Sequence, residues 1–442
     1  MVHRGIALIL AMGLNKASAF ASIPPQPTSS SCHRCLTSML RPIVYSTDVY
    51  HPSSPGLMNM NNEPHHDGKG RKEYDTAKMA GETIPGEMKR LVVTSPGNGT
   101  SVADCIIKVQ TVPIPSPKPG EVLIRVVAAP VNPSDYGGWY KSRGPSSSSY
   151  PMPMGIEGCG TVVSYGGFLG GITSSLRCPV GTNVGFVITD PAQGSYSEYV
   201  TVNAMTGAFP MPEDVPIEDC ASFFVNPYTA VGIVDTARRA GSSKAIVHTA
   251  AASQLGQMLN RLAMAEGMEI INVVRRAEQR EALEGLGAKH VIVTDDGQDD
   301  DPTAWKAELR AKVRDLGATC AFDAVSGDMT GHLLDCMPGR GIVYAYGVLA
   351  GKANGIDPLD LIYRRKELRG FLLTAWLREG GPMRMIPRML TASSTVNSGL
   401  KVGGWCRSQF TDTTMEGAHA EIVKLLGSSI TGKKLRIRFD GK

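Results

Sequence analysis

The sequence predicts an α/β protein in which a doubly wound parallel sheet is joined to a mostly β domain. First, residues 244–276 contain an apolar run, a turn of small residues, a helix-like segment and a second apolar run. This order is that of a βαβ unit. Second, strands and helices keep alternating up to residue 373, which is typical of a parallel sheet covered on both faces. Third, before residue 217 short β-rich runs are separated by Gly and Pro.

Composition and charge describe an ordinary globular protein. The 442 residues are enough for two or three domains, and 42% of them are hydrophobic while 19% are charged. The 45 Lys and Arg exceed the 41 Asp and Glu by only four, which argues against a nucleic-acid-binding surface. The cysteines beyond residue 100 are scattered and predict no disulfide framework, and we interpret Cys32 and Cys35 as an incidental pair.

The first 87 residues are expected to be a targeting region. We interpret 1–19 as a signal peptide, because a short apolar run is followed by small residues that suit a signal peptidase. Residues 20–87 are expected to be a transit peptide and a disordered spacer, since 20–47 lack acidic residues. The segment 17–21 resembles the bipartite presequence of algae with complex plastids. The hypothesis is a plastid protein without stable membrane association; a mitochondrial presequence and a secretory signal are the alternatives.

The mostly β domain is predicted to span 88–224 and to take up the tail 374–442. Expected strands in its first part are 88–95, 105–112, 122–130, 160–165, 183–189 and 196–202. The tail contains one clear helical pattern, at 415–426, and an exit strand at 434–439. We expect that this strand returns to the β domain.

The parallel-sheet domain is predicted to span 225–373. Two helical pieces meet near Asn226 and Pro227, and the βαβ unit follows them. Beyond that unit we expect strands at 290–293, 319–323, 340–346 and 366–372, and helices at 276–286, 302–316, 327–337 and 357–363.

The turn of the βαβ unit is the first candidate binding site. Its pattern places small residues at Ala250, Ser253 and Gly256 instead of the common G-x-G-x-x-G. Small residues let backbone N–H groups approach a pyrophosphate at the positive end of the following helix, which opens with Gln254 and Leu255. We therefore predict a dinucleotide site here.

The end of the second strand of the unit indicates which dinucleotide is bound. A carboxylate there would bind the ribose hydroxyls of NAD, but the chain has Arg275 and Arg276. Guanidinium groups make bidentate bonds to phosphate oxygens, so we predict NADPH. The alternative is a solvated, basic start to the next helix.

Several segments together resemble the medium-chain dehydrogenase/reductase superfamily, in its zinc-free branch of enoyl thioester reductases and quinone oxidoreductases. They occur in the family's order at 131–135, 155–160, 225–230, 250–256, 286–291, 322–325 and 341–347. The resemblance implies a GroES-like fold for the β domain and a Rossmann fold for the other. It also implies a homodimer, which we expect to form by sheet-edge pairing through 340–346.

The resemblance implies further site residues. Asn132 is expected beside the nicotinamide and Thr229 near its carboxamide. Backbone groups of two loops should also face the nicotinamide, and Lys433 or, in our assignment, Lys434 should reach the phosphates. The loop residues are Gly347, Val348, Leu349, Phe371 and Leu372. Zinc-dependent relatives carry a Cys near Asn132 and a His before Glu157, both of which are missing here, so we expect no metal.

The resemblance also implies the reaction, a reduction of an activated C=C bond in an enoyl thioester or enone by NADPH. Such enzymes place a Tyr proton donor shortly after the segment that contains Asn132. Our candidate is Tyr140, followed by Tyr136 and Arg143, in a loop that departs from the family spacing. The aromatic residues Trp139 and Trp376 are candidates for an acyl pocket or for core packing. An NADPH:quinone oxidoreductase and a redox-inactive NADPH-binding protein stay open as alternatives.

Overall fold

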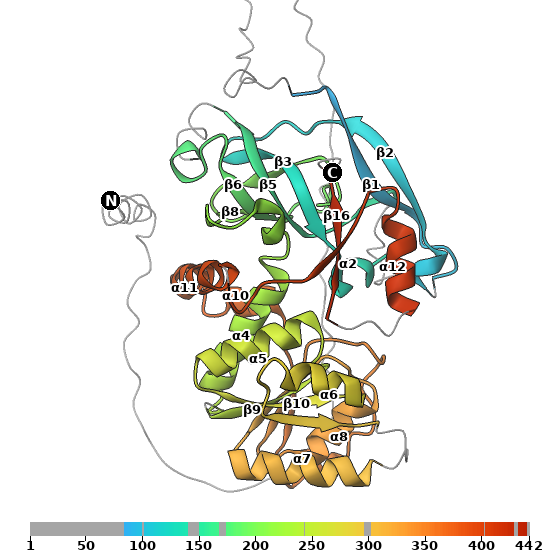
Figure 1. The fold of residues 1–442 in the computed structure, drawn as a ribbon, viewed down its shortest axis with the longest axis vertical. Helices are drawn as coiled ribbons and strands as arrows, with labels where there is room; N and C mark the ends of the chain where they lie inside the picture. The colour runs from blue at the N-terminus through green and yellow to red at the C-terminus, as the bar shows by residue number, and fades with distance from the viewer. Residues whose placement is uncertain are drawn as a thin grey trace, which may run out of the picture. The chain divides into compact units, whose positions relative to one another are not determined.

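The computed structural model describes residues 84–99, 101–139, 150–167, 174–242, 244–295, 302–401, 403–427 and 432–439 (Figure 1). The predicted targeting region, except for residues 84–87, and the loop that contains Tyr140 and Arg143 lie outside the described residues. Within the described ranges, none of the helices combines the length and the hydropathy needed to cross a bilayer.

A six-stranded parallel sheet forms the centre of the 225–373 segment, as the alternating pattern predicts (Figure 1). Its strand order is β11-β10-β9-β12-β13-β14, so the order reverses between β9 and β12, where α/β proteins of this type bind ligands. The strands are β9 (Ala245–Thr249), β10 (Glu269–Val274), β11 (His290–Val293), β12 (Cys320–Asp323), β13 (Ile342–Ala345) and β14 (Glu367–Gly370).

Helices cover both faces of this sheet because successive strand residues point to opposite sides. Ile246 and Phe322 pack with residues of α4 and α5, whereas Val247 and Val343 pack with residues of α7 and α8. These helices are α4 (Val225–Arg239), α5 (Gln254–Ala265), α7 (Thr303–Leu316) and α8 (Asp328–Cys336). Shorter helices are α6 (Ala277–Glu284) and α9 (Pro358–Ile362).

Mostly antiparallel strands make up the other domain, with only β15 and β16 paired in parallel among the described strands, so the predicted fold class is confirmed. A seven-stranded sheet has the order β15-β16-β3-β5-β6-β8, with β7 paired to β3, and a three-stranded sheet has the order β2-β1-β4. The strands of the larger sheet are β3 (Glu121–Pro130), β5 (Glu157–Tyr165), β6 (Asn183–Val187), β7 (Tyr199–Asn203), β8 (Ala208–Pro210), β15 (Phe410–Thr413) and β16 (Lys434–Arg438). The strands of the smaller sheet are β1 (Glu87–Ser95), β2 (Ile106–Pro113) and β4 (Met152–Pro153). Since β16 pairs with β3, the tail does return to this domain.

Short helical elements connect these sheets. The helix α2 (Pro133–Tyr136) follows β3, and its N-cap residue is Asn132. The 3-10 turn η3 (Ile217–Cys220) precedes α4, which places a bend before Asn226 and Pro227 as predicted. The remaining elements are η2 (Val102–Asp104) and α12 (Ala418–Gly427).

The tail contains two helices that the sequence pattern did not indicate, α10 (Leu373–Arg378) and α11 (Pro382–Leu400). The one helix expected in the tail, at 415–426, is present as α12, so these two helices are additional to it. Pro387 lies inside α11 and argues against a helix at the level of sequence. The helix is instead stabilised by packing, because Val396 and Leu400 are buried in the same core as α4.

The predicted edge strand of the parallel sheet is also wrong. Strand β13, which contains most of the segment 340–346, pairs with β12 on one side and with β14 on the other. The outer strand is β14, whose four residues are exposed. Strand order depends on long-range pairing, so the local sequence of β13 does not reveal which strand lies at the edge.

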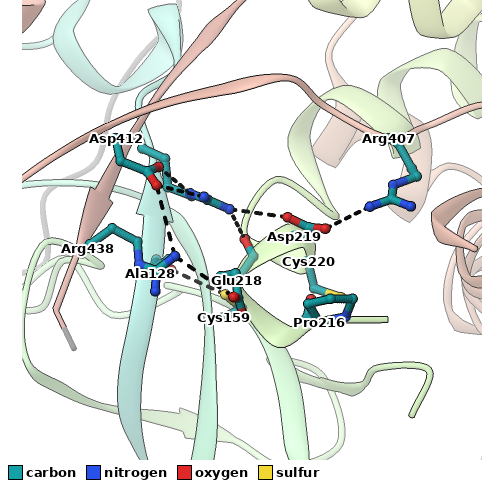
Figure 2. A network of polar contacts seen from close by, with 10 residues as sticks. Ala128, Cys159, Pro216, Glu218, Asp219, Cys220, Arg407, Asp412 and Arg438 are labelled. Atoms are coloured by element: carbon teal, nitrogen blue, oxygen red, sulfur yellow. Dashed lines mark hydrogen bonds and ion pairs between the residues drawn. The ribbon is translucent and has the colours of Figure 1, made fainter. Parts of the chain in front are cut away.

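An arginine network joins the end of the chain to the segment before α4. Arg436 makes a bidentate pair with Asp412, at 2.6 and 2.9 Å, and donates to the Glu218 carbonyl at 2.7 Å. Figure 2 shows Asp219 reaching toward Arg407, and Arg407 donates to it at 2.7 Å. The Arg436 guanidinium also lies over the Phe410 ring at 4.3 Å. This network fixes β16 against η3.

Candidate active site

The turn between β9 and α5 has the geometry of an anion-binding loop. Ala250 adopts φ of 49°, in the left-handed region that non-glycine residues rarely occupy. Ser253 is the N-cap of α5, and its side chain accepts a hydrogen bond from the Gly256 N–H at 3.1 Å. A Cβ at Gly256 would lie 2.2 Å from the Ala251 carbonyl oxygen, so only glycine allows this close approach. The pattern Ala250, Ser253, Gly256 thus forms a tight strand-to-helix turn.

The turn offers backbone donors. Among the described residues, none accepts a hydrogen bond from the N–H groups of Gln254 and Leu255, which begin α5. Such unpaired groups, together with the positive end of the helix dipole, are what a pyrophosphate requires. Ser253 uses its oxygen as an acceptor, and its hydroxyl proton stays available to a phosphate oxygen. The residues of the turn therefore fit a dinucleotide.

A second segment approaches this turn from the tail. The side-chain amide of Gln254 donates to the carbonyl of Gly432. The next residue, Lys433, is exposed, whereas Lys434 is buried. Because neighbouring residues at the start of a strand point in opposite directions, the solvent-accessible lysine next to the turn is Lys433.

Arg275 and Arg276 follow directly after β10. The Ala251 N–H donates to the Val273 carbonyl at 3.4 Å, which ties the turn to the end of β10. Both arginine backbone N–H groups donate to the side chain of Gln279, at 3.0 and 3.2 Å, so that the start of α6 is fixed. The Arg275 residue is exposed and Arg276 is partly buried. The two arginines thus lie at the edge of the sheet that carries the turn.

A buried carboxylate, that of Asp323, stabilises the loops that are expected near the nicotinamide. Asp323 accepts hydrogen bonds from Thr249, Thr330 and two backbone N–H groups. Ser326 then donates to the Gly347 carbonyl at 2.8 Å. A Cβ at Gly347 would lie 2.5 Å from the Ala324 carbonyl oxygen, so the loop crosses its neighbour closely.

Of the residues expected near the nicotinamide, some are exposed and others are buried. The side chains of Val348, Leu349 and Leu372 are about two-thirds exposed, at 64%, 63% and 64%. Thr229 on α4 is buried, and so is Phe371, whose ring packs edge-on against Phe322 at 6.3 Å. Exposed apolar side chains at this end of the sheet are available to a ligand.

Two tryptophans considered for an acyl pocket are core residues. Trp139 is 1% exposed, and Trp376 donates from its indole N–H to Asp235 at 2.7 Å. The Tyr150 hydroxyl donates to the Trp139 carbonyl at 3.0 Å, which ties the two described ends of the 140–149 loop together. Tyr136 packs on Trp139 with ring centroids 6.1 Å apart.

A cluster of buried polar residues surrounds Asn132. Its backbone N–H donates to Asp135 at 2.7 Å, its amide nitrogen donates to Glu157 at 2.9 Å, and its amide oxygen accepts from Lys434 at 2.6 Å. Asn132 is fully buried. We call this group, with Tyr196 and Ser222, the Asn132 cluster: Asn132, Asp135, Glu157, Tyr196, Ser222 and Lys434.

In this cluster Lys434 lies beside Asn132. We had expected Lys434 to bind the cofactor phosphates instead. Its ammonium group donates to Asn132 and, at 2.9 Å, to Ser222. The Lys434 ammonium group is thus bonded inside the protein, which does not suit the predicted contact with cofactor phosphates, whereas Lys433, directly before β16, is exposed.

Burial changes the charge balance of the cluster. It raises the pKa of Asp135 to about 7, although hydrogen bonds from the Asn132 backbone and from Tyr196 act in the opposite direction. Burial also lowers the pKa of Lys434, while the nearby carboxylates of Glu157 and Asp135 raise it. Burial, and next the Asp135 charge, raise the pKa of Tyr196.

Some members of this cluster gave little or no signal in the sequence. Asp135 and Glu157 belong to the segments that resemble the family, whereas Tyr196 and Ser222 lie outside every one of those segments. Tyr196 is 61 positions from Asp135, and Ser222 is 212 positions from Lys434. The pairing of β7 with β3 brings Tyr196 near Asp135, and the pairing of β16 with β3 brings Lys434 to Asn132.

Two family models match the chain. The first, the GroES-like domain of alcohol dehydrogenases, covers residues 118–213, and the second, described as zinc-binding dehydrogenase, covers residues 255–389. The described residues contain no group of three or more His, Cys, Asp or Glu placed to hold a metal. Since Asn132 and Ile156 stand where the ligands would be expected, these side chains do not fit zinc.

Individual relatives agree with these models. The mitochondrial enoyl-[acyl-carrier-protein] reductase of Bos taurus is 25% identical over 335 residues, which are 74% of this chain and 84% of the relative. Prostaglandin reductase-3 of Mus musculus is 27% identical over 312 residues, which are 66% and 74% of the two chains. The crystal structure of a candidate NADPH:quinone reductase from Mesorhizobium loti is 30% identical, with a TM-score of 0.68 over 81% of this chain and 100% of that one.

Proposed function

Since this chain belongs to the medium-chain dehydrogenase/reductase superfamily, we propose that it is an NADPH-dependent oxidoreductase that reduces an activated C=C bond. The substrate class is a small molecule, either a 2-enoyl thioester or an enone. The relatives named for enoyl-[acyl-carrier-protein] and prostaglandin reduction support this class.

The observation that carries the proposal is the turn that begins α5, with the two arginines after β10. Ala250, Ser253 and Gly256 form a tight turn, and at its end the N–H groups of Gln254 and Leu255 have no acceptor among the described residues. Arg275 and Arg276 supply positive charge at the same edge of the sheet. NADPH bound there supplies the hydride. The guanidinium groups would bind its ribose phosphate, and Lys433, in place of Lys434, would bind the pyrophosphate.

The chain's own residues would orient and polarise the substrate. Negative charge develops on the substrate carbonyl oxygen during the reduction, so a fixed donor must lie near it. The backbone of the loop Gly347, Val348 and Leu349 is held by Ser326 and Asp323 and is well placed to orient the nicotinamide. Thr229, Phe371 and Leu372 are the other residues that we propose to contact the nicotinamide. Tyr140 remains the proposed proton donor.

Steady-state oxidation of NADPH tests the proposal. The acceptors are crotonyl-CoA, an alkenal and a benzoquinone, each with NADPH and with NADH. Turnover of crotonyl-CoA or of the alkenal supports the reduction of C=C bonds. No turnover on any acceptor, combined with tight NADPH binding, would instead mean a redox-inactive NADPH-binding protein.

A quinone is the second candidate acceptor. The Mesorhizobium loti protein that is 30% identical carries the name of a quinone reductase, and this chain spans all of it. Quinones require the same hydride donor and a less demanding protonation, which suits a chain whose proton-donor loop departs from the family spacing. Turnover restricted to the benzoquinone would decide for this alternative.

We also propose a homodimer through the outer strand of the parallel sheet, β14. Its residues are exposed, and pairing with a second copy would satisfy the free edge. Leu368 lies on this strand, so Leu368→Lys should convert the dimer to a monomer in light scattering because like charges would face each other. A monomeric wild-type chain would contradict the dimer.

The proposed location is an organelle, and within that class a plastid. The mitochondrial names of the enoyl reductase relatives support an organelle, and the composition of residues 1–47 supports a bipartite presequence. Fusing residues 1–87 to a fluorescent protein tests this, and a diffuse signal outside organelles would contradict it.

A further inference from the structure

Lys434 carries a charge in a place where a charge is costly. The residue is 5% exposed, and its ammonium group lies within hydrogen-bond distance of Asn132 and Ser222 only, among the described residues. Lysine is almost never fully buried without a partner, because an ammonium ion loses its hydration. A buried lysine at this point of the fold therefore calls for a reason.

We infer that Lys434 is a positioning residue for the reduction, and that it acts by holding Asn132 and the start of α4 in one arrangement. The inference rests on the proposed function, since it names a residue of the same site. It assigns no contact with the substrate or with the cofactor to Lys434.

The ammonium group determines how the Asn132 amide is oriented. An ammonium ion can only donate, so the atom that faces it at 2.6 Å must be the amide oxygen. A carboxylate can only accept, so the atom that faces Glu157 at 2.9 Å must be the amide nitrogen. Both neighbours thus select the same orientation of the amide, and Asn132 is the N-cap residue of α2. This helix leads to Tyr136 and into the proposed proton-donor loop.

The same ammonium group reaches the start of α4 by two routes. It donates directly to Ser222, and through Asn132 it is linked to Glu157. Glu157 in turn accepts from the backbone N–H groups of Phe224 and Val225, at 2.9 and 3.0 Å. The helix that begins there carries Thr229, one of the proposed nicotinamide contacts. Lys434 therefore links the proton-donor side of the site to its nicotinamide side.

The second reason why position 434 requires a lysine is the balance of charge in the Asn132 cluster. Glu157 is fully buried, and among the described residues its carboxylate accepts only from N–H groups. Asp135 is the neighbouring acid. The ammonium group supplies the positive charge that offsets them. An apolar residue at 434 would leave the amide oxygen of Asn132 without its donor and Glu157 without a cation, and a glutamine would still remove the cation. Both changes would loosen the linkage without touching the turn at Ser253.

Lys434→Met tests the inference because methionine keeps much of the length and removes the charge. We expect kcat to fall about 100-fold, as for a misplacement of about 1 Å among reacting groups. The dissociation constant of NADPH, measured by nicotinamide fluorescence, should change less than twofold, because the turn and the arginines are untouched. The matched control is Lys424→Met, whose lysine is largely exposed on α12 and should leave both quantities unchanged.

A double-mutant cycle tests the route through Asn132. Asn132→Leu alone should lower kcat to a similar extent, and the double variant Asn132→Leu, Lys434→Met should be no worse than either single variant. Independent, multiplying losses would overturn the claim that Lys434 acts through Asn132.

Further readouts keep the inference separable from folding and from the proposed function. If Lys434→Met does not fold, Lys434→Gln is measured in its place, with at least a tenfold fall in kcat expected at unchanged NADPH affinity. In Lys434→Ala, ethylammonium should restore kcat, whereas tetramethylammonium, which has no N–H donor, should not. A folded variant with wild-type kcat, or equal losses in kcat and NADPH affinity, overturns the inference. An inactive wild type overturns the proposed function instead.

Discussion

The hydroxyl group of Tyr196 donates to Asp135 at 2.9 Å, and both side chains are buried, with Tyr196 in a core that contains residues of β1 and β16. The other carboxylate oxygen of Asp135 is buried without a hydrogen-bond partner among the described residues. An acid in such a place holds its proton up to a higher pH than an acid in water. The pair therefore makes the stability of the fold depend on pH.

Asp135 should destabilise the folded protein progressively as the pH rises. Its pKa is raised from 3.8 to about 7, so between these values the folded chain keeps a proton that the unfolded chain has released. The contribution is fully present below pH 3.8 and is lost as the pH rises through about 7. Over this window it amounts to about 4 kcal/mol in the free energy of unfolding.

Urea unfolding of wild type and Asp135→Asn at pH 5 and pH 8 checks this expectation. The asparagine keeps an acceptor for Tyr196 and for the Asn132 N–H but does not titrate. Wild type should lose more free energy of unfolding between the two pH values than the variant does. Equal losses in the two proteins would show that Asp135 titrates normally.

Gly256→Ala should damage both the fold and the cofactor site. The added Cβ would lie 2.2 Å from the Ala251 carbonyl oxygen, a backbone atom that cannot move aside cheaply. Overpacking of this kind costs about 1–3 kcal/mol, and the displaced turn should weaken NADPH binding about tenfold or more. Thermal unfolding and NADPH titration measure the two effects. Gly427→Ala, where the new Cβ meets no atom within 4 Å, is the neutral control.

Replacing Arg275 and Arg276 by alanine should change the cofactor preference. Each charge-assisted bond to a phosphate contributes about 1.5–3 kcal/mol, so either single variant should weaken NADPH binding about 10- to 100-fold. NADH has no phosphate on its adenine ribose, and its affinity should change less than twofold. Arg314→Ala, at a side chain that is 77% exposed on α7, should change neither. If the affinities for both cofactors fell equally, the arginines would serve only as the start of α6 and not as ligands of the ribose phosphate.

Arg436→Met should destabilise the protein without changing NADPH affinity. The Arg436 guanidinium is buried and satisfies Asp412 and the Glu218 carbonyl, so its removal leaves several acceptors unpaired. Because Asp412 is partly exposed, we expect a loss of about 2–3 kcal/mol, below the range for a fully buried pair. Arg407→Met, which breaks only the more exposed bond to Asp219, should cost about 1 kcal/mol or less. Similar losses in urea unfolding would contradict this ranking.

The part of the site that local sequence encodes could be predicted. Ala250, Ser253 and Gly256 stand within seven positions between two apolar runs, so their pattern alone identifies a tight strand-to-helix turn. The strand order, by contrast, is set by pairing between distant segments. The expected edge strand is β13, whereas the strand found at the edge is β14.

The Asn132 cluster and the tail helices could not be predicted for a related reason. Tyr196 and Lys434 are ordinary residues in their own segments, and they acquire partners only when the sheet closes. In α11, Pro387 argues against a helix, whereas the burial of Val396 and Leu400 against α4 decides for one. Tertiary packing here outweighs the local preference.

The contact between Lys434 and Asn132 also determines at what stage of synthesis the proposed reductase site can form. The two residues are separated by 302 positions, so a ribosome that has just released Asn132 must add all of these before the ammonium group exists. At about 5–20 residues per second this takes on the order of 15–60 s. Until then Asn132 and Glu157 have no cation, and the larger sheet lacks the strand beside β3. The nascent chain should therefore acquire its reductase site only near the end of synthesis, well after its nucleotide-binding turn has formed.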